Sequence, residues 1–517
     1  MTTDLNTNWY TKYVEKKFTI HIKWSTVPAS DVATKSTVLL ESGNYPEVFY
    51  SGQFRQSQVL RYAKQGVLVP METYFQKYAP NVWHGLLTEP GLKQALTAPD
   101  GHIYGLPNYN VCLHCYYSAK YWLNVLKLKE YGLAMPKTTA DFEHVLQVFK
   151  QHGLTPLTGA IDGGSTGGWH SSPVTFLMNS FIYDDGGSAY GGNYMYIADG
   201  KVAFAATTPQ WKQGLQYIHK LYSEGLIDQG ALSQANSVLV KQAAKGSVGV
   251  VPWGCMLCFD PNYPKHVDQW RALSPLTGPA GVHNAAFFGN GPAGSGLVFV
   301  VTNKATDAQK IAVSKMMNEI WSIDGMSLMQ FGPAGDGLWN KAAKGVTAMN
   351  GKQAIQDVNT LKLNTPNLKE NFSWYQMGPM FVNYEYRYGA QKAYAPYAPG
   401  GLGAESALQL ETELNYVGLQ PRYVVPAGLW IDPANAQQYS LQQTNINNYV
   451  NQWTAQFING SKSLDSDWNA YVQGAQNLGL AQFIQSTQTA MGKPMDTLAG
   501  NLFKKDQTGI KYLQSLK

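Results

Sequence analysis

Short apolar runs that alternate with amphipathic segments constrain the fold of this chain more than any other feature of its sequence. Residues 246–252 and 296–302 are apolar, begin with glycine and predict buried strands. Apolar side chains recur at helical spacing over residues 54–66, 139–152, 209–225 and 306–321. Strands that alternate with helices predict an α/β fold with predominantly parallel sheets. The last part of the chain, residues 400–517, is amide-rich and predicted to be mostly helical.

The length and composition of the chain limit its architecture and its partners. A chain of 517 residues exceeds what one core usually supports, so we expect at least two lobes. Charged residues make up 14% and the formal net charge is +5 with no basic cluster, which argues against a nucleic-acid partner. Aromatic residues make up 13%, and such rings either stack on sugars or fill a large core. No apolar run has the length of a membrane helix.

An Asp-Gly turn followed by a short strand that ends at a proline lies at residues 100–107 (DGHIYGLP). Taken alone, this motif predicts only a hairpin. Five further motifs occur around it in a fixed order: SGNYPEVF at 42–49, GVLVPM at 66–71, PKTTADF at 136–142, LYSEGLID at 221–228 and DWNAYV at 467–472. This ordered set resembles the extracellular solute-binding proteins of ABC importers, which include the maltodextrin- and alginate-binding proteins.

The resemblance implies a two-lobed, periplasmic-binding-protein-like α/β fold with a ligand cleft between the lobes. Hinge crossings are expected near residues 110–116, 293–298 and 360–372. The N-lobe is then built from residues 1–112 and 295–365, and the C-lobe from residues 113–294 and 366–517. Members of the family usually begin with one more strand ahead of the helix predicted over residues 8–15, which suggests a truncated start or a lobe that lacks that strand. Residues 18–24 alternate as a strand.

Candidate ligand-binding residues follow from the same resemblance and from the chemistry of sugar recognition, which needs ring faces and convergent hydrogen-bonding groups. Aromatic residues expected to stack on sugar rings are Trp169, Trp253, Tyr384 and Tyr386, the last two on one face if their segment is extended. Polar residues expected to select hydroxyls are Gln53, Arg55, Asn108 and His170. Further candidates that flank these are Tyr50, Tyr109, Phe288, Asn290, Trp339 and Phe381. The alternative for each is a solvated loop or core packing.

The four cysteines form two C-x-x-C motifs, Cys112 with Cys115 and Cys255 with Cys258. Paired motifs of this kind can hold zinc, but their separation is far outside compact zinc-ribbon spacing. Family geometry would bring the two segments together in the C-lobe, so disulfides between the segments, buried free thiols and a metal site all stay open. Some relatives carry a calcium loop where this chain has residues 150–156, which contain no carboxylate. We expect no cofactor and no metal.

The function implied by the resemblance is a non-catalytic receptor that delivers an oligosaccharide to the permease subunits of an ABC importer. A receptor of the same fold for a non-sugar ligand such as a peptide is one alternative. A carbohydrate-active hydrolase is the other, with two of Asp162, Asp184, Asp185 and Glu385 as its carboxylate pair.

The family resemblance also implies a location and an assembly. Residues 1–9 lack the basic and apolar regions of a signal peptide. We nevertheless expect an extracellular or periplasmic monomer whose leader, or the lipid anchor of a cell-surface lipoprotein, is absent from this chain.

Overall fold

The structure, a computed structural model, describes residues 4–28, 31–160, 169–187, 192–289, 296–336, 338–359, 362, 369–375, 377–499 and 503–517. Helices and strands are mixed along the whole chain, as an α/β fold requires. The chain divides into two compact units. Unit 1 contains residues 1–111, 291–393 and 426–436, and unit 2 contains residues 112–290, 394–425 and 437–517.

Unit 1 is built around a small antiparallel sheet in which strands far apart in the sequence are neighbours. Its elements up to the first change of unit are α1 (Trp9–Phe18), α2 (Val32–Ser42), β1 (Val48–Phe54), α3 (Gln56–Lys64), α4 (Glu72–Tyr78), α5 (Pro80–Thr88), α6 (Leu92–Leu96), β2 (Gly105–Leu106) and β3 (Tyr109–Asn110). The later ones are β10 (Leu297–Val301), α14 (Asp307–Ile320), α15 (Ile323–Phe331), β11 (Trp339–Lys341), β12 (Gln356–Val358), β13 (Phe381–Val382) and the π-helix η5 (Glu385–Ala390). Strand β10 lies between β1 and β2, and α14 packs against α4, α5 and α15.

Unit 2 contains the largest sheet that the structure describes, with strand order β5-β8-β4-β9. Its first elements are α7 (Leu113–Tyr116), β4 (Tyr121–Asn124), α8 (Val125–Glu130), α9 (Thr139–Gln151), β5 (Thr155–Leu157), α10 (Val174–Met178), β6 (Met195–Ala198), β7 (Lys201–Phe204) and η3 (Ala205–Thr207). These are followed by α11 (Pro209–Ser223), α12 (Asn236–Ala244), β8 (Val248–Pro252), α13 (Met256–Phe259), η4 (Tyr263–Lys265) and β9 (Trp270–Leu273). Every residue of β4 and β8 is buried, so these strands form the centre of the unit's core.

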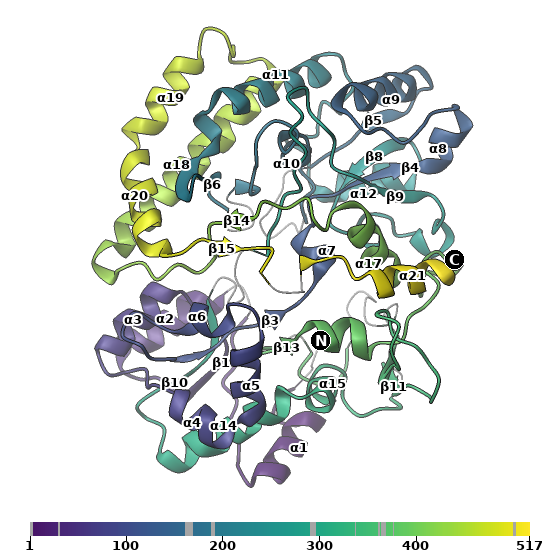
Figure 1. Cartoon of the computed structure of the whole chain (residues 1–517). Helices are drawn as coiled ribbons and strands as arrows, with labels where there is room; N and C mark the ends of the chain where they lie inside the picture. Colours follow the sequence, from purple (N-terminus) through teal and green to yellow (C-terminus); the bar gives the residue numbers. More distant parts are fainter. Residues whose placement is uncertain are drawn as a thin grey trace. The chain divides into compact units, whose positions relative to one another are not determined.

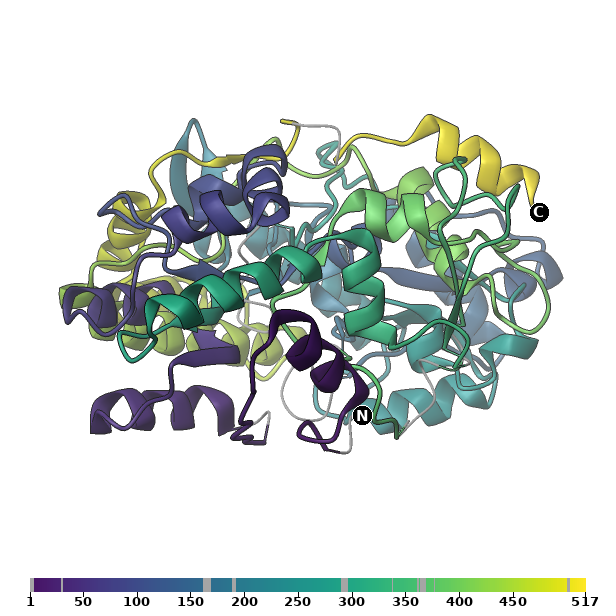
Figure 2. The same ribbon diagram turned by 90° about the horizontal axis from the view of Figure 1, so that it is seen from below.

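The last part of unit 2 is helical, as predicted. Its elements are α17 (Ala404–Asn415), β14 (Tyr423–Val424), α18 (Pro433–Asn459, which begins in unit 1), α19 (Trp468–Asn477), α20 (Leu480–Met491), β15 (Met495–Asp496) and α21 (Gln507–Ser515). The C-terminal helix α21 lies beside α17 in both views (Figures 1 and 2) and contacts it. Among the described residues, no helix is both long enough and apolar enough to cross a membrane.

The predicted helices are confirmed by α3, α9, α11 and α14, and the two predicted buried strands by β8 and β10. The expectation of predominantly parallel sheets is wrong. Strand β1 pairs antiparallel with β10, and β4 pairs antiparallel with β8 and with β9. Only two pairings between the described strands are parallel, β5 with β8 and β13 with β3. Apolar runs give the burial of a strand but not the direction of its neighbour, because burial on both faces is compatible with either pairing.

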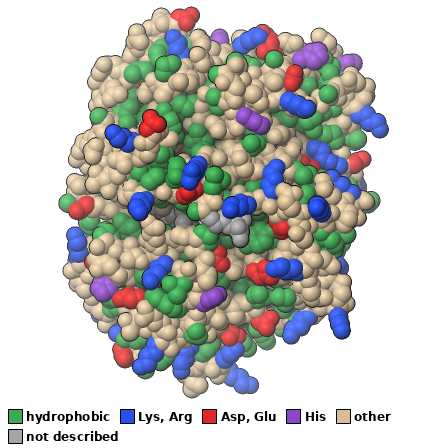
Figure 3. Space-filling model, viewed as in Figure 1, with side chains coloured by type: hydrophobic (Ala, Val, Ile, Leu, Met, Phe, Trp, Pro, Cys, Tyr) green, Lys and Arg blue, Asp and Glu red, His purple; other side chains and the backbone are tan. Residues whose placement is uncertain are grey.

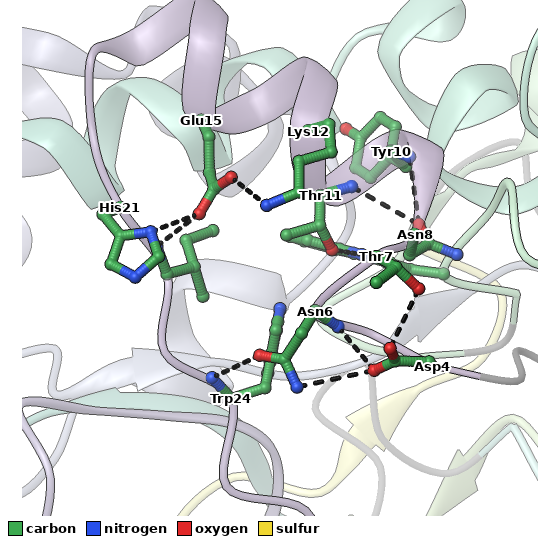
Figure 4. Close-up of polar contacts among 12 residues, drawn as sticks. Asp4, Asn6, Thr7, Asn8, Tyr10, Thr11, Lys12, Glu15, His21 and Trp24 are labelled. Carbon is green, nitrogen blue, oxygen red and sulfur yellow. Dashed lines mark hydrogen bonds and ion pairs between the residues drawn. The ribbon is translucent and has the colours of Figure 1, made fainter.

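The strand predicted over residues 18–24 is also wrong. Helix α1 continues to Phe18, and Thr19 at φ 53° ends it. The carboxylate of Glu15 then accepts a hydrogen bond from the main-chain nitrogen of Ile22 at 2.9 Å and lies 2.8 Å from His21 Nδ1 (Figure 4). A side chain thus binds this stretch of backbone, which pairs with no strand of the described sheets.

The boundaries of the units differ from the predicted lobes in the second half of the chain. The first change of unit, after Val111, lies within the crossing expected at residues 110–116. Residues 369–393 belong to unit 1, whereas the prediction assigned everything after residue 365 to the C-lobe. The reason is packing: β13 pairs with β3, and Trp374 packs edge-on against Tyr10 with ring centroids 4.8 Å apart.

Candidate functional site

The clearest cluster of candidate residues in unit 2 surrounds Trp169. Strand β8 ends at Pro252, and Trp253 and Gly254 follow it directly. The main-chain nitrogen of Gly254 donates a hydrogen bond to the carbonyl oxygen of Trp169 at 2.8 Å. Trp169 is partly exposed, whereas the side chain of Trp253 is only 4% exposed. Of the two tryptophans, Trp169 is therefore the one that offers a ring to solvent.

His170 follows Trp169 directly in the chain, and its ring lies against that of Phe288. Their ring centroids are 3.9 Å apart, and Phe288 is partly exposed. His170 has φ 57°, a left-handed conformation that is uncommon for a residue other than glycine and that clusters at functional sites. Burial lowers the pKa of His170 well below its ordinary value, so the imidazole is neutral at pH 7. A neutral imidazole both donates and accepts, which suits recognition of a hydroxyl.

Two buried carboxyl groups hold the neighbouring loop in place. Asp185 accepts main-chain hydrogen bonds from Gly187 at 3.0 Å, Asn193 at 2.8 Å and Tyr194 at 2.9 Å. Burial, together with the adjacent Asp185, raises the pKa of Asp184 to about 8. Asp185 is thus committed to ordering the backbone, and Asp184 is protonated at neutral pH.

The third described carboxylate of the hydrolase hypothesis is in the other unit. Glu385 belongs to unit 1, is exposed, and lies 3.5 Å from Lys352 Nζ. The fourth, Asp162, lies outside the described residues, as does the ligand candidate Asn290.

In unit 1, Tyr50 belongs to an aromatic group that the sequence did not predict. Its ring meets Trp374 edge-on at 5.1 Å and Trp24 at 5.9 Å. Trp24 and Tyr50 are partly exposed, while Trp374 is fully buried. Ser51 follows at φ 61°, where the pairing of β1 with β10 is irregular, and such bulges redirect side chains. The sequence shows Trp24, Tyr50 and Trp374 only as aromatic residues in separate segments, and it does not indicate that their rings are in contact.

The polar candidates of unit 1 have different surroundings. Gln53 and Arg55 are exposed, at the end of β1 and before α3. Asn108 is partly buried, and its side-chain oxygen accepts a hydrogen bond from the main-chain nitrogen of Met380 at 3.0 Å. These three residues stay candidates, with Asn108 partly engaged in holding the backbone.

Several aromatic candidates of unit 1 pack in its interior. Phe381 stacks between Tyr109 at 5.5 Å and Trp321 at 4.4 Å. Trp339 lies in a buried cluster with Phe331, Leu338 and Val358. Core packing therefore accounts for Tyr109, Trp339 and the stack around Phe381.

Tyr384 and Tyr386 do not share the face of an extended segment. Tyr384 precedes the π-helix η5, which contains Tyr386. The ring of Tyr384 lies 5.1 Å from that of Tyr388, and Tyr386 is buried. Helical winding thus separates two residues that strict alternation would have aligned.

Both C-x-x-C motifs are closed internally as disulfides. Of the alternatives that the sequence left open, disulfide formation is therefore confirmed, but the bonds form within each segment and not between the two. Cys112 is bonded to Cys115 with Cα atoms 5.1 Å apart, and Cys255 to Cys258 with Cα atoms 5.5 Å apart. No described cysteine is free. Cys112, His114 and Cys115 place one potential ligand atom each within 4.8 Å of one another, but both sulfur atoms take part in the disulfide.

Comparison with known proteins agrees with this architecture. Residues 3–318 match the model of the bacterial extracellular solute-binding protein family. The chain is 25% identical over 521 aligned residues to the fructooligosaccharide ABC transporter substrate-binding protein FusA of Streptococcus pneumoniae, covering 94% of this chain and 87% of FusA.

The solved structures that share the fold include the following two. The S. pneumoniae FusA complex with kestose is similar with a TM-score of 0.69 and 21% identity, covering 94% of this chain and 95% of that one. An HMO-binding solute-binding protein from Bifidobacterium longum infantis is similar with a TM-score of 0.73 and 20% identity, covering 98% and 97%. The family match covers more than half of the sequence, and this chain therefore belongs to the bacterial extracellular solute-binding proteins.

Proposed function

We propose that this chain is a non-catalytic receptor for an oligosaccharide, which it delivers to the permease subunits of an ABC importer outside the cytoplasmic membrane. The observation that carries the proposal is the cluster in unit 2 of a partly exposed Trp169, the neutral His170 and Phe288. An aromatic face beside a group that both donates and accepts hydrogen bonds suits a sugar ring and its hydroxyls. The similarity to FusA supports the same ligand class.

In unit 1 we propose that Trp24, Tyr50, Gln53 and Arg55 supply further contacts. Trp24 and Tyr50 offer partly exposed rings, and the two polar side chains are free to reorient because they are exposed. Solute-binding proteins trap their ligands by hinge closure, so we expect the radius of gyration in solution X-ray scattering to fall when ligand is added.

Absence of catalysis is part of the proposal. Asp185 is committed to main-chain hydrogen bonds and Asp184 is protonated, and Glu385 lies in the other unit. A glycosidase needs an ionised carboxylate that is free to act as nucleophile or base. Asp184 is not ionised, and the oxygens of Asp185 are occupied by main-chain nitrogens. Chromatography of the oligosaccharide after long incubation should recover it at its original length, and shortened products would favour the hydrolase.

A thermal-shift screen tests the ligand class. Kestose, nystose, neutral glucans, alginate oligomers and a peptide pool are each added to the purified protein. A ligand that binds only the folded state raises the melting temperature. We expect a shift with one class of oligosaccharide that Trp169→Ala reduces and that Trp468→Ala, in α19, retains. A shift with peptides alone would make this chain a receptor for a non-sugar ligand.

A further inference from the structure

The indole of Trp169 contacts one turn that is closed by a disulfide and the residue that directly precedes another such turn. That residue is Gly254, whose nitrogen binds the carbonyl oxygen of Trp169. A Cβ placed on Gly254 would stand 2.5 Å from ring atoms of Trp169, so the indole rests directly on this glycine. The next residue, Cys255, precedes the four-residue helix α13 and is bonded to Cys258.

The other turn contacts the ring of Trp169 through His114. The ring centroids of His114 and Trp169 are 6.0 Å apart, with an interplanar angle of 69°. His114 belongs to the four-residue helix α7, between the bonded residues Cys112 and Cys115. Its Nε2 lies 3.5 Å from Cys112 Sγ, so the imidazole packs against the disulfide itself.

Lys120 connects the two turns. Its side-chain nitrogen Nζ donates to the carbonyl oxygen of His114 at 3.0 Å and to that of Tyr117. Its own carbonyl oxygen accepts a hydrogen bond from the main-chain nitrogen of Trp253 at 3.1 Å. One fully buried side chain thus binds the carbonyl groups at the end of α7 while its backbone holds the segment that leads into α13.

We propose that the two disulfides jointly position the indole of Trp169 and thereby set the affinity for the ligand, a role that rests on the proposed function. Helices of four residues are too short to be stable by their own hydrogen bonds. Covalent closure restricts each turn and so holds Gly254 and His114 against the indole. Cys258 is exposed, so the second disulfide is open to attack by a thiol.

Reduction of the whole protein by dithiothreitol tests this role. Each disulfide takes up two electrons and two protons and becomes two thiols, and the reagent becomes a cyclic disulfide. Tryptophan is replaced by 5-fluorotryptophan, and Trp169→Phe assigns the fluorine resonance of Trp169. We expect reduction to shift or broaden this resonance while that of Trp468 stays unchanged. Calorimetric affinity for the oligosaccharide found by the screen should fall by about threefold to tenfold.

The disulfides could instead affect binding only by stabilising the fold. To distinguish this from a role through Trp169, the fall in oligosaccharide affinity on reduction is also measured in the Trp169→Ala variant. If the disulfides act through Trp169, reduction then changes the affinity little, because coupled residues are not additive. The paired variants Cys112→Ala/Cys115→Ala and Cys255→Ala/Cys258→Ala divide the effect between the two turns.

An unchanged Trp169 resonance, or an equal loss of affinity with and without Trp169, would overturn the inference. Absence of oligosaccharide binding in both redox states would instead contradict the proposed function. In that case the fluorine spectrum would still decide whether the disulfides position Trp169.

Discussion

The Cα atom of Gly254 lies directly against the indole of Trp169, with no room for a side chain between them. A Cβ would stand 2.5 Å from ring atoms Cδ2 and Cε3. The segment between the end of β8 and the start of α13 thus packs directly against the indole of Trp169. The identity of residue 254 therefore controls where the partly exposed ring of Trp169 can lie.

Gly254→Ala should displace the indole of Trp169 and weaken ligand binding. The added methyl group would overlap the indole of Trp169, so either this ring or the backbone at residue 254 must move. We therefore expect the free energy of unfolding in chemical denaturation to fall by about 1–3 kcal/mol. Gly230→Ala is the matched control, since its Cβ would meet mainly the end of the flexible Gln234 side chain. Equal stability and affinity of both variants would show that the contact at Gly254 is loose.

Asp185→Asn should destabilise unit 2. The carboxylate accepts several main-chain hydrogen bonds, and an amide has only one oxygen to replace its two. We expect a loss of about 2–3 kcal/mol in the free energy of unfolding. Asp199→Asn should leave stability unchanged, because Asp199 is exposed and its φ of 49° is well tolerated by asparagine. An unchanged free energy of unfolding in Asp185→Asn would mean that water replaces these hydrogen bonds.

The contribution of Asp184 to stability should fall as pH rises through the neutral range. Burial raises the pKa of Asp184 from 3.8 to about 8, so the folded state retains a proton that the unfolded state has lost. Between these two values the free energy of unfolding decreases by about 1.4 kcal/mol per pH unit for this group. Urea denaturation between pH 4 and pH 8 measures this, and Asp184→Asn should flatten the slope.

Glu413 contributes to the same trend over a narrower range. Burial raises its pKa from 4.5 to about 7, so its contribution ends near that pH. Glu413→Gln should therefore remove part of the slope below pH 7 and leave the part above it. If Asp184→Asn and Glu413→Gln both kept the pH profile of the unmodified protein, these two groups would not be the ones whose raised pKa values produce the slope.

Tyr50→Phe and Tyr117→Phe each remove one hydroxyl group and should differ in their effect on stability. The hydroxyl of Tyr50 is buried and makes no hydrogen bond with the described residues, so its loss should stabilise the protein or be neutral. The hydroxyl of Tyr117 donates to Gln420 Oε1 at 2.7 Å, and its loss should cost about 1 kcal/mol. Melting temperatures by calorimetry compare the two, and a large loss in Tyr50→Phe would reveal a bound water.

Local interactions explain the helices that the sequence predicted correctly. Thr138 accepts a hydrogen bond from the nitrogen of Asp141 at 3.1 Å, and Asp141 accepts one from the nitrogen of Thr138 at 3.0 Å. Thr306 and Gln309 begin α14 in the same way. These capping boxes use residues three positions apart, so they are readable from the sequence together with the spacing of apolar residues.

The candidate site was predictable in part. The sequence identified Trp169, His170 and Phe288 individually, and the structure brings His170 against Phe288 and places Trp169 beside Gly254. It did not predict Trp24 near Tyr50, because the stretch after α1 is held by the side chain of Glu15 rather than by a sheet. The exposed fraction of each aromatic side chain could not be predicted either, because aromatic residues occur both in cores and at surfaces.

The sequence by itself determined the class of fold, the helices α3, α9, α11 and α14, the two buried strands and a low content of charge, which Figure 3 shows as charged side chains scattered over a larger uncharged surface. Only the tertiary structure decided which sulfur atoms bond, which strands pair and in which direction, and which tryptophan keeps a partly exposed ring. Helix caps and apolar spacing act between neighbours in the chain. Strand pairing and burial depend on contacts between segments hundreds of residues apart, such as β1 with β10, and local sequence carries no record of them.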